Sequence, residues 1–420
     1  MIQRPRGTRD LLPPESRLWH AVEDVARGVF GAFGGDEIRT PIFEATELFV
    51  RTVGEGTDIV HKEMYTFPDR KGRSLTLRPE NTAGVARAWI ENQLHDRSHP
   101  LRLYYIGPMF RYERMQRGRY RQFSQIGLEI LGASSPLADA ELLAVLHEFL
   151  SRLGFTDLVI HLNNLGDPED RPRYQALVRE RLEPRRDELC EDCRRRLDTN
   201  PLRVLDCKVP HCQGLAADLP AVSDVASEAS RAHVDRVEAQ LERLGIAFVR
   251  NPRLVRGLDY YLRTVFEVVS PQLGTGAVLC GGGRYDRLIS DLGGPAIPGV
   301  GFAIGEDRLV EVLPEGFAAT VLARPRLLLV GLGDAAQDAL LPLALAWQRQ
   351  GVPVELELGG RSLKAALRRA DKDGFRAVAI VGDDELAAGE VTVRDLGQGA
   401  QQRIAAAAMP EWWKALKADG

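Results

Sequence analysis

The pattern of the sequence changes near residue 320, and this change constrains the fold more than any other feature. After a linker at residues 314–325, strand-like and helix-like stretches alternate regularly. Strands are expected at residues 326–330, 352–357 and 377–381, and helices at residues 335–349 and 363–369. Such alternation predicts a small α/β domain with a largely parallel sheet over residues 326–420.

The first 320 residues mix helices and strands without that regularity. Helical spacing of apolar residues predicts helices at residues 15–33, 139–152 and 230–244, the second with Asp139 as its N-cap. Strand-like runs occur at residues 75–78, 103–106 and 123–131. Helices set against several antiparallel strands predict an α+β domain over residues 1–320. A charged stretch at about residues 168–225, rich in Arg and Pro, is expected to interrupt it as a small helical insertion.

Composition narrows the class of protein. The N-terminus has no apolar stretch of signal-peptide type, and no run approaches the roughly 20 apolar residues of a membrane span. We therefore expect a soluble, cytoplasmic protein with no membrane partner. The formal net charge of −4 does not exclude nucleic acid, because a local basic face matters more than the sum.

Three segments carry side chains suited to chemistry. In the first, residues 76–82, the side chains of Arg78, Glu80 and Thr82 alternate as they would on one face of a strand. A carboxylate beside a hydroxyl can hold an ammonium group. The alternative is a surface ion pair at the end of a strand.

The second segment, residues 107–123, has five Arg within eleven residues around Gly118. Its flanks are expected to pair as strands, with the middle as their loop. A hairpin that presents guanidinium groups and aromatic rings together suits a triphosphate, an adenine ring or an RNA end. The alternative is a solvated basic loop.

The third segment has two parts, residues 254–261 and 280–286. In the first part, Tyr260 and Tyr261 follow Arg256, and paired Tyr near an Arg can line a polar pocket. In the second part, three consecutive Gly would let a ligand approach the backbone closely. Each part, taken alone, could instead be a turn beside a core.

Together these segments resemble the histidyl-tRNA synthetases, a family of class II aminoacyl-tRNA synthetases. Residues 40–44, 110–113 and 301–309 are similar to the three class motifs, of which the first builds a dimer interface in the family. Residues 256–261 and 282–286 are more specific, because they mark the histidine enzyme within the class. The resemblance implies an antiparallel-sheet catalytic domain, a C-terminal anticodon-binding domain and a homodimer.

The resemblance also implies a two-step reaction with ATP and Mg²⁺. Histidine's carboxylate attacks the α-phosphate of ATP, and the resulting histidyl-adenylate passes its histidyl group to tRNA(His). Because the nucleophile is already an anion, the first step needs positioning and charge stabilisation rather than a base. By the family pattern, Arg111 would bridge the α-phosphate and the substrate carboxylate, and Arg308 would hold the γ-phosphate. Glu113 would face the nucleotide, and Arg256 resembles the special catalytic arginine.

Histidine recognition is expected from the matching family positions. Neutral imidazole carries one donor and one acceptor nitrogen, and Glu129 and Tyr261 match the positions that bind them. The positions that hold the α-amino group and line the pocket are Glu80, Thr82, Gln125 and Tyr260. In the anticodon domain, one expected helix carries basic side chains that either contact tRNA phosphates or form a solvated face: Arg361, Lys364, Arg368 and Arg369.

Several positions depart from the bacterial family pattern. Asn81 stands where Gly is usual, Ser124 where His is common, Met115 where Pro is usual, and Glu306-Asp307 where Leu-Glu is usual. Asn81 and Ser124 are expected beside the pocket, where they would bear on the affinity for histidine.

The cysteines allow two interpretations. Cys190, Cys193, Cys207 and Cys212 follow a C-x₂-C and C-x₄-C spacing, with His211 adjacent, that is close to a structural zinc site. The alternative is a set of reduced thiols in the helical insertion. No metal ligand is expected among the catalytic residues.

Two other functions share this fold. One is the non-enzymatic, synthetase-like regulatory subunit of an ATP phosphoribosyltransferase, which usually lacks the anticodon domain and degrades the histidine signatures. The other is a class II synthetase for Thr, Pro or Gly. The presence of residues 326–420 and the intact segment 256–261 favour the histidine enzyme.

Overall fold

The computed structural model describes residues 2–418 apart from 55–56, 58, 97–99, 115–117, 206, 271–277 and 324. The chain forms two compact units, Met1–Val321 and Leu322–Gly420. No helix in these described ranges is long and apolar enough to cross a membrane.

The first unit is built around a sheet of eight described strands, most of them antiparallel. In order across the sheet they are β1 (Asp36–Glu37), β5 (Leu101–Phe110), β6 (Gln122–Leu131), β11 (Gly299–Gly305), β10 (Val278–Arg284), β9 (Leu262–Val269), β7 (Val159–Asn164) and β8 (Phe248–Arg250). Only the short edge strands β1 and β8 pair in parallel. The predicted α+β class is confirmed.

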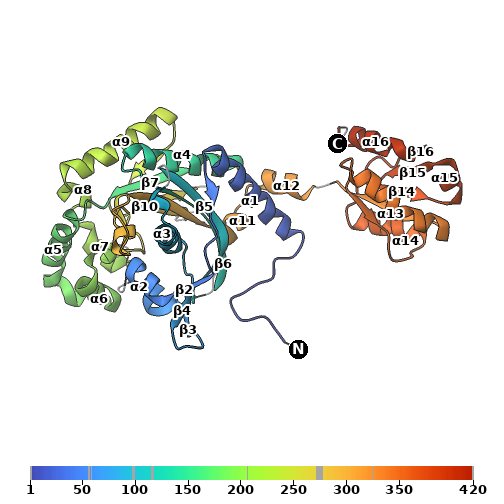
Figure 1. The fold of residues 1–420 in the computed structure, drawn as a ribbon. Helices are drawn as coiled ribbons and strands as arrows, with labels where there is room; N and C mark the ends of the chain where they lie inside the picture. The colour runs from blue at the N-terminus through green and yellow to red at the C-terminus, as the bar shows by residue number, and fades with distance from the viewer. Residues whose placement is uncertain are drawn as a thin grey trace. The chain divides into compact units, whose positions relative to one another are not determined.

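Three helices cover one face of this sheet (Figure 1): α1 (Glu15–Ala32), α4 (Pro136–Arg152) and α9 (Glu228–Leu244). Their apolar side chains, such as Phe30 and Phe149, form one core with Ile126, Leu128 and Phe302 of the strands. Ser135 and Ser227 cap α4 and α9 with their side-chain oxygens. This layer fixes the back of the sheet and leaves the other face for the site.

The opposite face carries shorter elements. A three-stranded sheet of β2 (Phe43–Ala45), β4 (Ser74–Leu77) and β3 (Tyr65–Pro68) lies with α2 (Thr46–Val53), a π-helical turn (Ile59–Glu63), α3 (Thr82–Glu91), a 3₁₀ turn (Leu94–Asp96) and α10 (Leu288–Asp291). The insertion is helical as predicted: α5 (Asp170–Leu182), a 3₁₀ turn (Glu183–Glu188), α6 (Glu191–Thr199), a 3₁₀ turn (Pro201–Val204), α7 (Pro210–Ala217) and α8 (Val222–Val225). The short helix α11 (Glu306–Glu311) follows β11.

The second unit is an α/β domain with a mixed sheet. β13 (Val354–Leu356), β12 (Leu327–Gly331) and β14 (Ala377–Val381) are parallel, and β15 (Glu390–Asp395) and β16 (Gln401–Ala405) continue the sheet in antiparallel pairing. Its helices are α13 (Asp334–Gln348), α14 (Leu363–Lys372), α15 (Asp383–Ala388) and α16 (Met409–Ala418), with a 3₁₀ turn at Ala406–Ala408. The expectation of a largely parallel sheet was therefore wrong for the last two strands.

The segment expected as a linker contains a helix, α12 (Glu315–Leu322). Phe317 of this helix packs against the core of the first unit, and Gly154 leaves room beside Pro314. Partial burial of the Phe317 ring favours a helix where the sequence indicated only a linker.

A buried ion pair joins the helix layer to the sheet. Arg284 ends β10, is wholly buried, and donates to both carboxylate oxygens of Asp139 in α4. His233 of α9 lies 3.3 Å from the same carboxylate, and Arg284 also donates to the Ala133 carbonyl at 3.1 Å. The prediction that Asp139 caps α4 was wrong, because Ser135 is the cap and Asp139 lies inside the first turn.

We predict that Asp139→Ala lowers the free energy of unfolding of the first unit by about 3–5 kcal/mol, because the buried guanidinium of Arg284 loses its buried partner and keeps only the partly exposed Asp286. As a control, Glu148→Ala breaks the exposed pair of Glu148 with Arg152 and should cost about 1 kcal/mol or less. Urea denaturation followed by circular dichroism measures both. Equal losses in the two variants would contradict the assigned role of the pair.

Candidate active site

A small polar cavity of about 110 Å³ opens on the face of the sheet opposite the helix layer. Most of the residues that the sequence indicated line it: Glu80, Thr82, Arg111, Gln125, Glu129, Arg256, Tyr260 and Tyr261. The other lining residues are Leu258, Gly281, Tyr285, Gly301, Phe302 and Ala303. Glu113 and Arg308 do not line it. Segments far apart in the sequence thus meet at one site.

The cavity exists because glycines occupy the middle of the sheet. Gly301 of β11 lies opposite Glu129 of β6 in the ladder, and a Cβ at Gly301 would stand 1.6 Å from a Glu129 carboxylate oxygen. A Cβ at Gly281 would stand 2.5 Å from the Arg256 guanidinium carbon. The two glycines therefore leave space against the sheet for a carboxylate and a guanidinium group.

Glu129 is the centre of a hydrogen-bond network in this cavity. Its carboxylate, almost completely buried, accepts from the Thr82 hydroxyl at 2.7 Å, the Tyr105 hydroxyl at 3.4 Å and the Tyr285 hydroxyl. Burial raises the pKa of Glu129 to about 8. Sequence reasoning missed Tyr105 and Tyr285 as site residues. Tyr285 lies inside the specific segment 282–286, whereas Tyr105 has the pattern of an ordinary buried strand residue.

Glu80 reaches the cavity in a different way from the one expected. Strand β4 ends at Leu77, before Pro79, so Arg78, Glu80 and Thr82 do not share one face of a strand. The Glu80 carboxylate instead accepts from the backbone N–H groups of Thr82 at 2.8 Å and Ala83 at 2.9 Å, in the first turn of α3. Burial raises the pKa of Glu80.

Two arginines approach the cavity from different parts of the chain, one after β5 and one from the segment between β8 and β9. Arg111 follows β5, donates to the Pro79 carbonyl at 2.7 Å, and lies over the Phe123 ring at 5.4 Å. Arg256 pairs with Glu267 of β9. Together they give the cavity a positive side that faces the carboxylates of Glu80 and Glu129.

Arg308 and Glu113 lie outside this cavity, near the arginine-rich loop. Arg308 is in α11, with its backbone 3.5 Å from a Cβ position on Gly118, and burial lowers its pKa. Glu113 lies 3.3 Å from Arg119 and 3.8 Å from Arg111. Both residues thus border the loop, where a longer ligand extending from the cavity would meet them.

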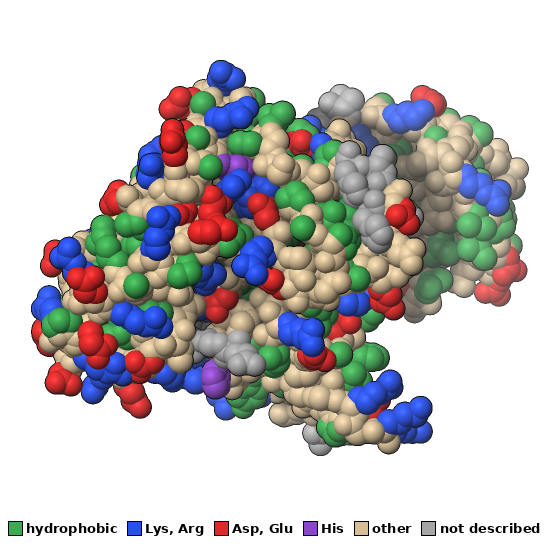
Figure 2. Space-filling view, turned by 60° about the vertical axis from the view of Figure 1, so that its left-hand side comes forward, with side chains coloured by type: hydrophobic (Ala, Val, Ile, Leu, Met, Phe, Trp, Pro, Cys, Tyr) green, Lys and Arg blue, Asp and Glu red, His purple; other side chains and the backbone are tan. Residues whose placement is uncertain are grey.

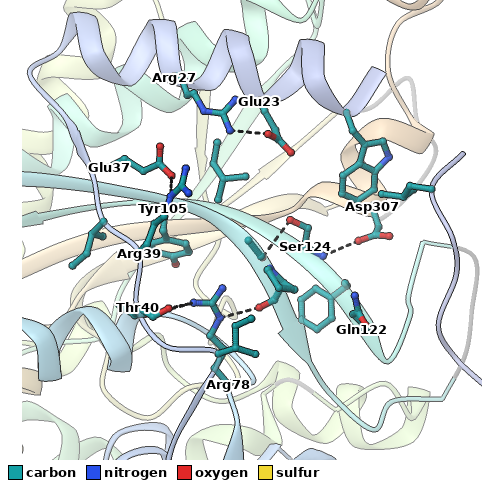
Figure 3. A pocket seen from close by; sticks show the side chains of 18 of the residues that line it. Glu23, Arg27, Glu37, Arg39, Thr40, Arg78, Tyr105, Gln122, Ser124 and Asp307 are labelled. Atoms are coloured by element: carbon teal, nitrogen blue, oxygen red, sulfur yellow. Dashed lines mark hydrogen bonds and ion pairs between the residues drawn. The ribbon is translucent and has the colours of Figure 1, made fainter. Parts of the chain in front are cut away.

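A second, larger cavity of about 590 Å³ lies beside strand β5 at the edge of the sheet (Figure 3). Arg78 points into it and donates to the Pro108 carbonyl at 2.8 Å and to the Thr40 hydroxyl at 3.0 Å. The Asn81 side chain turns the same way and accepts from Thr40 at 2.5 Å. Arg78 therefore anchors the walls of this edge cavity rather than a ligand in the polar cavity.

Two of the departures from the family pattern, Ser124 and Asp307, line this edge cavity. Asn81 bonds with Thr40 and Arg78, which also line it. Ser124 donates its N–H to Asp307 at 2.9 Å. Asp307 also pairs with Arg9 at 2.9 Å. Neither Asn81 nor Ser124 lines the polar cavity. Met115 lies outside the described residues.

The basic residues of the second unit divide into two kinds. Arg361 precedes α14 rather than lying on it, and it pairs with Glu357 at 2.6 Å. Arg369 pairs with the same carboxylate at 2.8 Å. Lys364 and Arg368 are exposed on α14 and line one groove. Two of the four predicted residues are thus tied into ion pairs.

An antiparallel sheet with an arginine-lined polar cavity, followed by a separate α/β domain, defines a class II aminoacyl-tRNA synthetase. Residues 7–169 and 174–309 match the model of the histidyl-tRNA synthetase family, and residues 327–416 match an anticodon-binding domain. The chain belongs to the histidyl-tRNA synthetase family.

Individual relatives agree over the whole length. The chain is 50% identical to the histidine–tRNA ligase of Desulforudis audaxviator and 51% identical to that of Nitratidesulfovibrio vulgaris. Each match covers 96% of this chain and 96% of the relative. It superposes on the apo S. aureus histidyl-tRNA synthetase with a TM-score of 0.82 at 36% identity, covering 99% of this chain and 100% of the other. A Bacillus halodurans C structure, described as an ATP phosphoribosyltransferase regulatory subunit/histidyl-tRNA synthetase, has a TM-score of 0.67 at 24% identity and covers 91% of this chain and 98% of its own. That last likeness shows the fold alone.

The pKa of Glu129 predicts a pH dependence of stability. The pKa of an exposed glutamate is about 4.3. Between that pH and about 8, Glu129 therefore holds a proton in the folded chain that it has released in the unfolded chain. The stability of the first unit should therefore fall as the pH rises through this window and level off above it. Glu129→Gln should show a shallower decline in the thermal midpoint. Parallel curves for the two proteins would show that Glu129 titrates as an ordinary carboxylate.

Proposed function

We propose that this chain is a histidine–tRNA ligase, which activates L-histidine with ATP and transfers it to tRNA(His). The observation that supports this most directly is the polar cavity. It combines two buried carboxylates, two arginines and two adjacent tyrosines within about 110 Å³. Such a cavity suits a small zwitterion with a polar ring.

The cavity offers a separate partner to each polar group of histidine. Gln125 has a buried side-chain oxygen with no hydrogen-bond partner, and Glu80 lies beside it in the lining, so these two would receive the α-ammonium group. Glu129 and Tyr261 would bind the two imidazole nitrogens as acceptor and donor. Thr82 would act by orienting Glu129, to which it already donates, and Tyr260 would support Tyr261, since their ring centroids are 4.7 Å apart.

The first step would depend on arginines that stabilise negative charge at the α-phosphate. Arg111 is placed to bridge the substrate carboxylate and the α-phosphate, and Arg256 to neutralise charge that develops on that phosphate. The β- and γ-phosphates would extend toward Arg308 and Glu113, with Mg²⁺ entering as part of the ATP complex. As a carboxylate oxygen of histidine bonds to the α-phosphorus, the bond from that phosphorus to the bridging oxygen breaks, so pyrophosphate leaves and histidyl-adenylate remains. A ribose hydroxyl at the end of the tRNA attacks its carbonyl and releases AMP.

The second unit would bind the anticodon end of the tRNA. Lys364 and Arg368 are exposed and sit in one groove, where they are free to contact phosphates. Arg361 and Arg369 would instead shape this surface through Glu357. Because charging of tRNA serves translation, we propose that the chain works in the cytoplasm.

ATP–pyrophosphate exchange tests this function. Histidine should support exchange, and Thr, Pro and Gly should not. In Gly301→Ala, the added methyl displaces the Glu129 carboxylate, so KM for histidine should rise by about 10-fold or more, since loss of a positioned polar contact costs 1–3 kcal/mol. Gly28→Ala is the control, because a Cβ there meets nothing within 4 Å.

The outcome of this assay separates the candidates. Exchange with another amino acid alone would assign a different class II synthetase. Histidine binding without exchange would assign a regulatory, non-enzymatic subunit. An unchanged KM in Gly301→Ala would contradict the placement of the imidazole at Glu129.

We also propose that the chain acts as a homodimer. Ile42 and Phe43 in the first class motif are 44% and 53% exposed, and Phe67 on β3, at the other edge of the three-stranded sheet, is 40% exposed. Large apolar side chains gathered on one small sheet are typical of a surface that another protein covers.

Phe43→Asp should therefore convert the dimer to a monomer, because it places charge in the centre of this patch. Size-exclusion chromatography with light scattering measures the mass. Leu358→Asp, at an 85% exposed position in the second unit, is the matched control and should stay dimeric. A monomeric wild-type chain would overturn the proposal.

A further inference from the structure

The helical insertion holds a compact cluster of four cysteines. Cys190 precedes α6, Cys193 lies in α6, Cys207 follows the turn Pro201–Val204, and Cys212 lies in α7. Their sulfur atoms all lie within 4.8 Å of one another, although the residues span three separate elements. None of them forms a disulfide. The fold thus brings four thiols together at one point.

The spacing of the sulfurs fits a single tetrahedral ion. Cys190 Sγ and Cys207 Sγ are 3.8 Å apart. Zinc–sulfur bonds of about 2.3 Å in a regular tetrahedron place the sulfurs about 3.8 Å apart, whereas a disulfide requires about 2.05 Å. The cluster therefore has the geometry of a metal centre rather than of an oxidised pair.

The backbone around the cluster favours thiolates. The N–H of Cys190 points to Cys212 Sγ at 3.3 Å, and the N–H of Val209 points to Cys207 Sγ at 3.5 Å. Hydrogen bonds donated to sulfur stabilise its anionic, metal-binding form. His211 is not part of the cluster, because it is mostly exposed and faces Glu188 at 3.5 Å. The donor set is four sulfurs, which among common ions suits Zn²⁺.

The elements next to the first two cysteines bury few side chains of their own. The turn Glu183–Glu188 buries no side chain, and α6 buries only Cys193 and Leu197. Figure 2, which brings the side of α5 and α6 forward, shows Lys and Arg interspersed with Asp and Glu over the surface. Exposed pairs such as Arg186 with Asp198 stabilise little. A bound metal would add stability at this point of the insertion, beyond the core that its other helices form.

Residues near the cluster in the sequence contact the segment that lines the active site. Asn200, which ends α6, donates to Asp259 at 2.6 Å, and Arg171 of α5 lies 3.5 Å from the same carboxylate oxygen. Asp259 belongs to the segment that carries Arg256 and Tyr261. The position of α6 is thus coupled to the position of two cavity residues.

We propose that Cys190, Cys193, Cys207 and Cys212 bind one structural Zn²⁺ ion, which fixes α6 and α7 and, through Asn200, supports the segment that lines the active site. On binding, the thiols lose their protons to solvent and four zinc–sulfur bonds form, without any redox change. This inference does not depend on the catalytic activity.

Metal analysis of the full chain, purified without chelator, tests the proposal. The wild type and Cys280→Ala should each carry about one zinc per chain, since Cys280 is buried in the separate core under the helix layer. Cys193→Ala and Cys207→Ala should each bind zinc at least about 10-fold more weakly. Zinc-free wild type, iron in place of zinc, or equal zinc in all four proteins would overturn the proposal.

A measurement on the wild type alone covers the case in which the variants fail to fold. A thiol-specific mercurial should release zinc in step with modification of the thiols, detected by a zinc-binding dye, and should lower the thermal midpoint. Thiol modification without zinc release would contradict the site. Because zinc content is measured without substrates, this result stands apart from the exchange assay. A chain active with histidine but free of zinc would refute only the zinc centre.

Discussion

The active site depends on one buried carboxylate that lies over a glycine. Burying Glu129 would be costly unless its oxygens were hydrogen-bonded, and three hydroxyls meet that demand. Those hydroxyls come from α3, β5 and the segment after β10, so satisfying one carboxylate brings three parts of the fold to a single point. The glycine opposite, Gly301, is what makes room for it.

Side chains along β6 point alternately to the two faces of the sheet, and the two sets have different surroundings. Gln125 and Glu129 face the cavity, whereas Ile126, Leu128 and Ile130 enter the core under α1 and α4. A shift of one residue in the β6 register would bury the polar pair in that core and expose the apolar residues to the ligand. The polar lining of the cavity and the hydrophobic core therefore depend on the same register of β6.

Much of the fold and the cavity was predictable from the sequence, for identifiable reasons. A distinctive segment located Arg256 and Tyr261 at the cavity, because it combines residues in a way that composition alone rarely produces. The family resemblance that this segment carried located Glu129. Contacts that join distant residues were not predictable. Asp139 and Arg284 are 145 residues apart, so the sequence suggested only a helix cap. Tyr105 has no local sign of its role, since a buried strand tyrosine is common.

The direction of a side chain was equally hard to predict. Asn81 follows Glu80 directly and was expected beside the histidine pocket. The end of β4 before Pro79 and the start of α3 turn consecutive side chains apart, so that Asn81 bonds with Arg78 and Thr40 at the edge cavity. Local geometry at a strand-to-helix turn, rather than distance along the chain, decides which cavity a residue meets.

The adjacent residues Arg284 and Tyr285 have a consequence for assembly inside the cell. Arg284 is held by α4 on one side of the sheet, and Tyr285 bonds with Glu129 on the other. A nascent chain whose α4 has not yet docked would leave Tyr285 without its support and Glu129 without one of its three hydroxyl partners. Under the proposed role of Glu129, the histidine site is therefore complete only in chains whose α4 has docked.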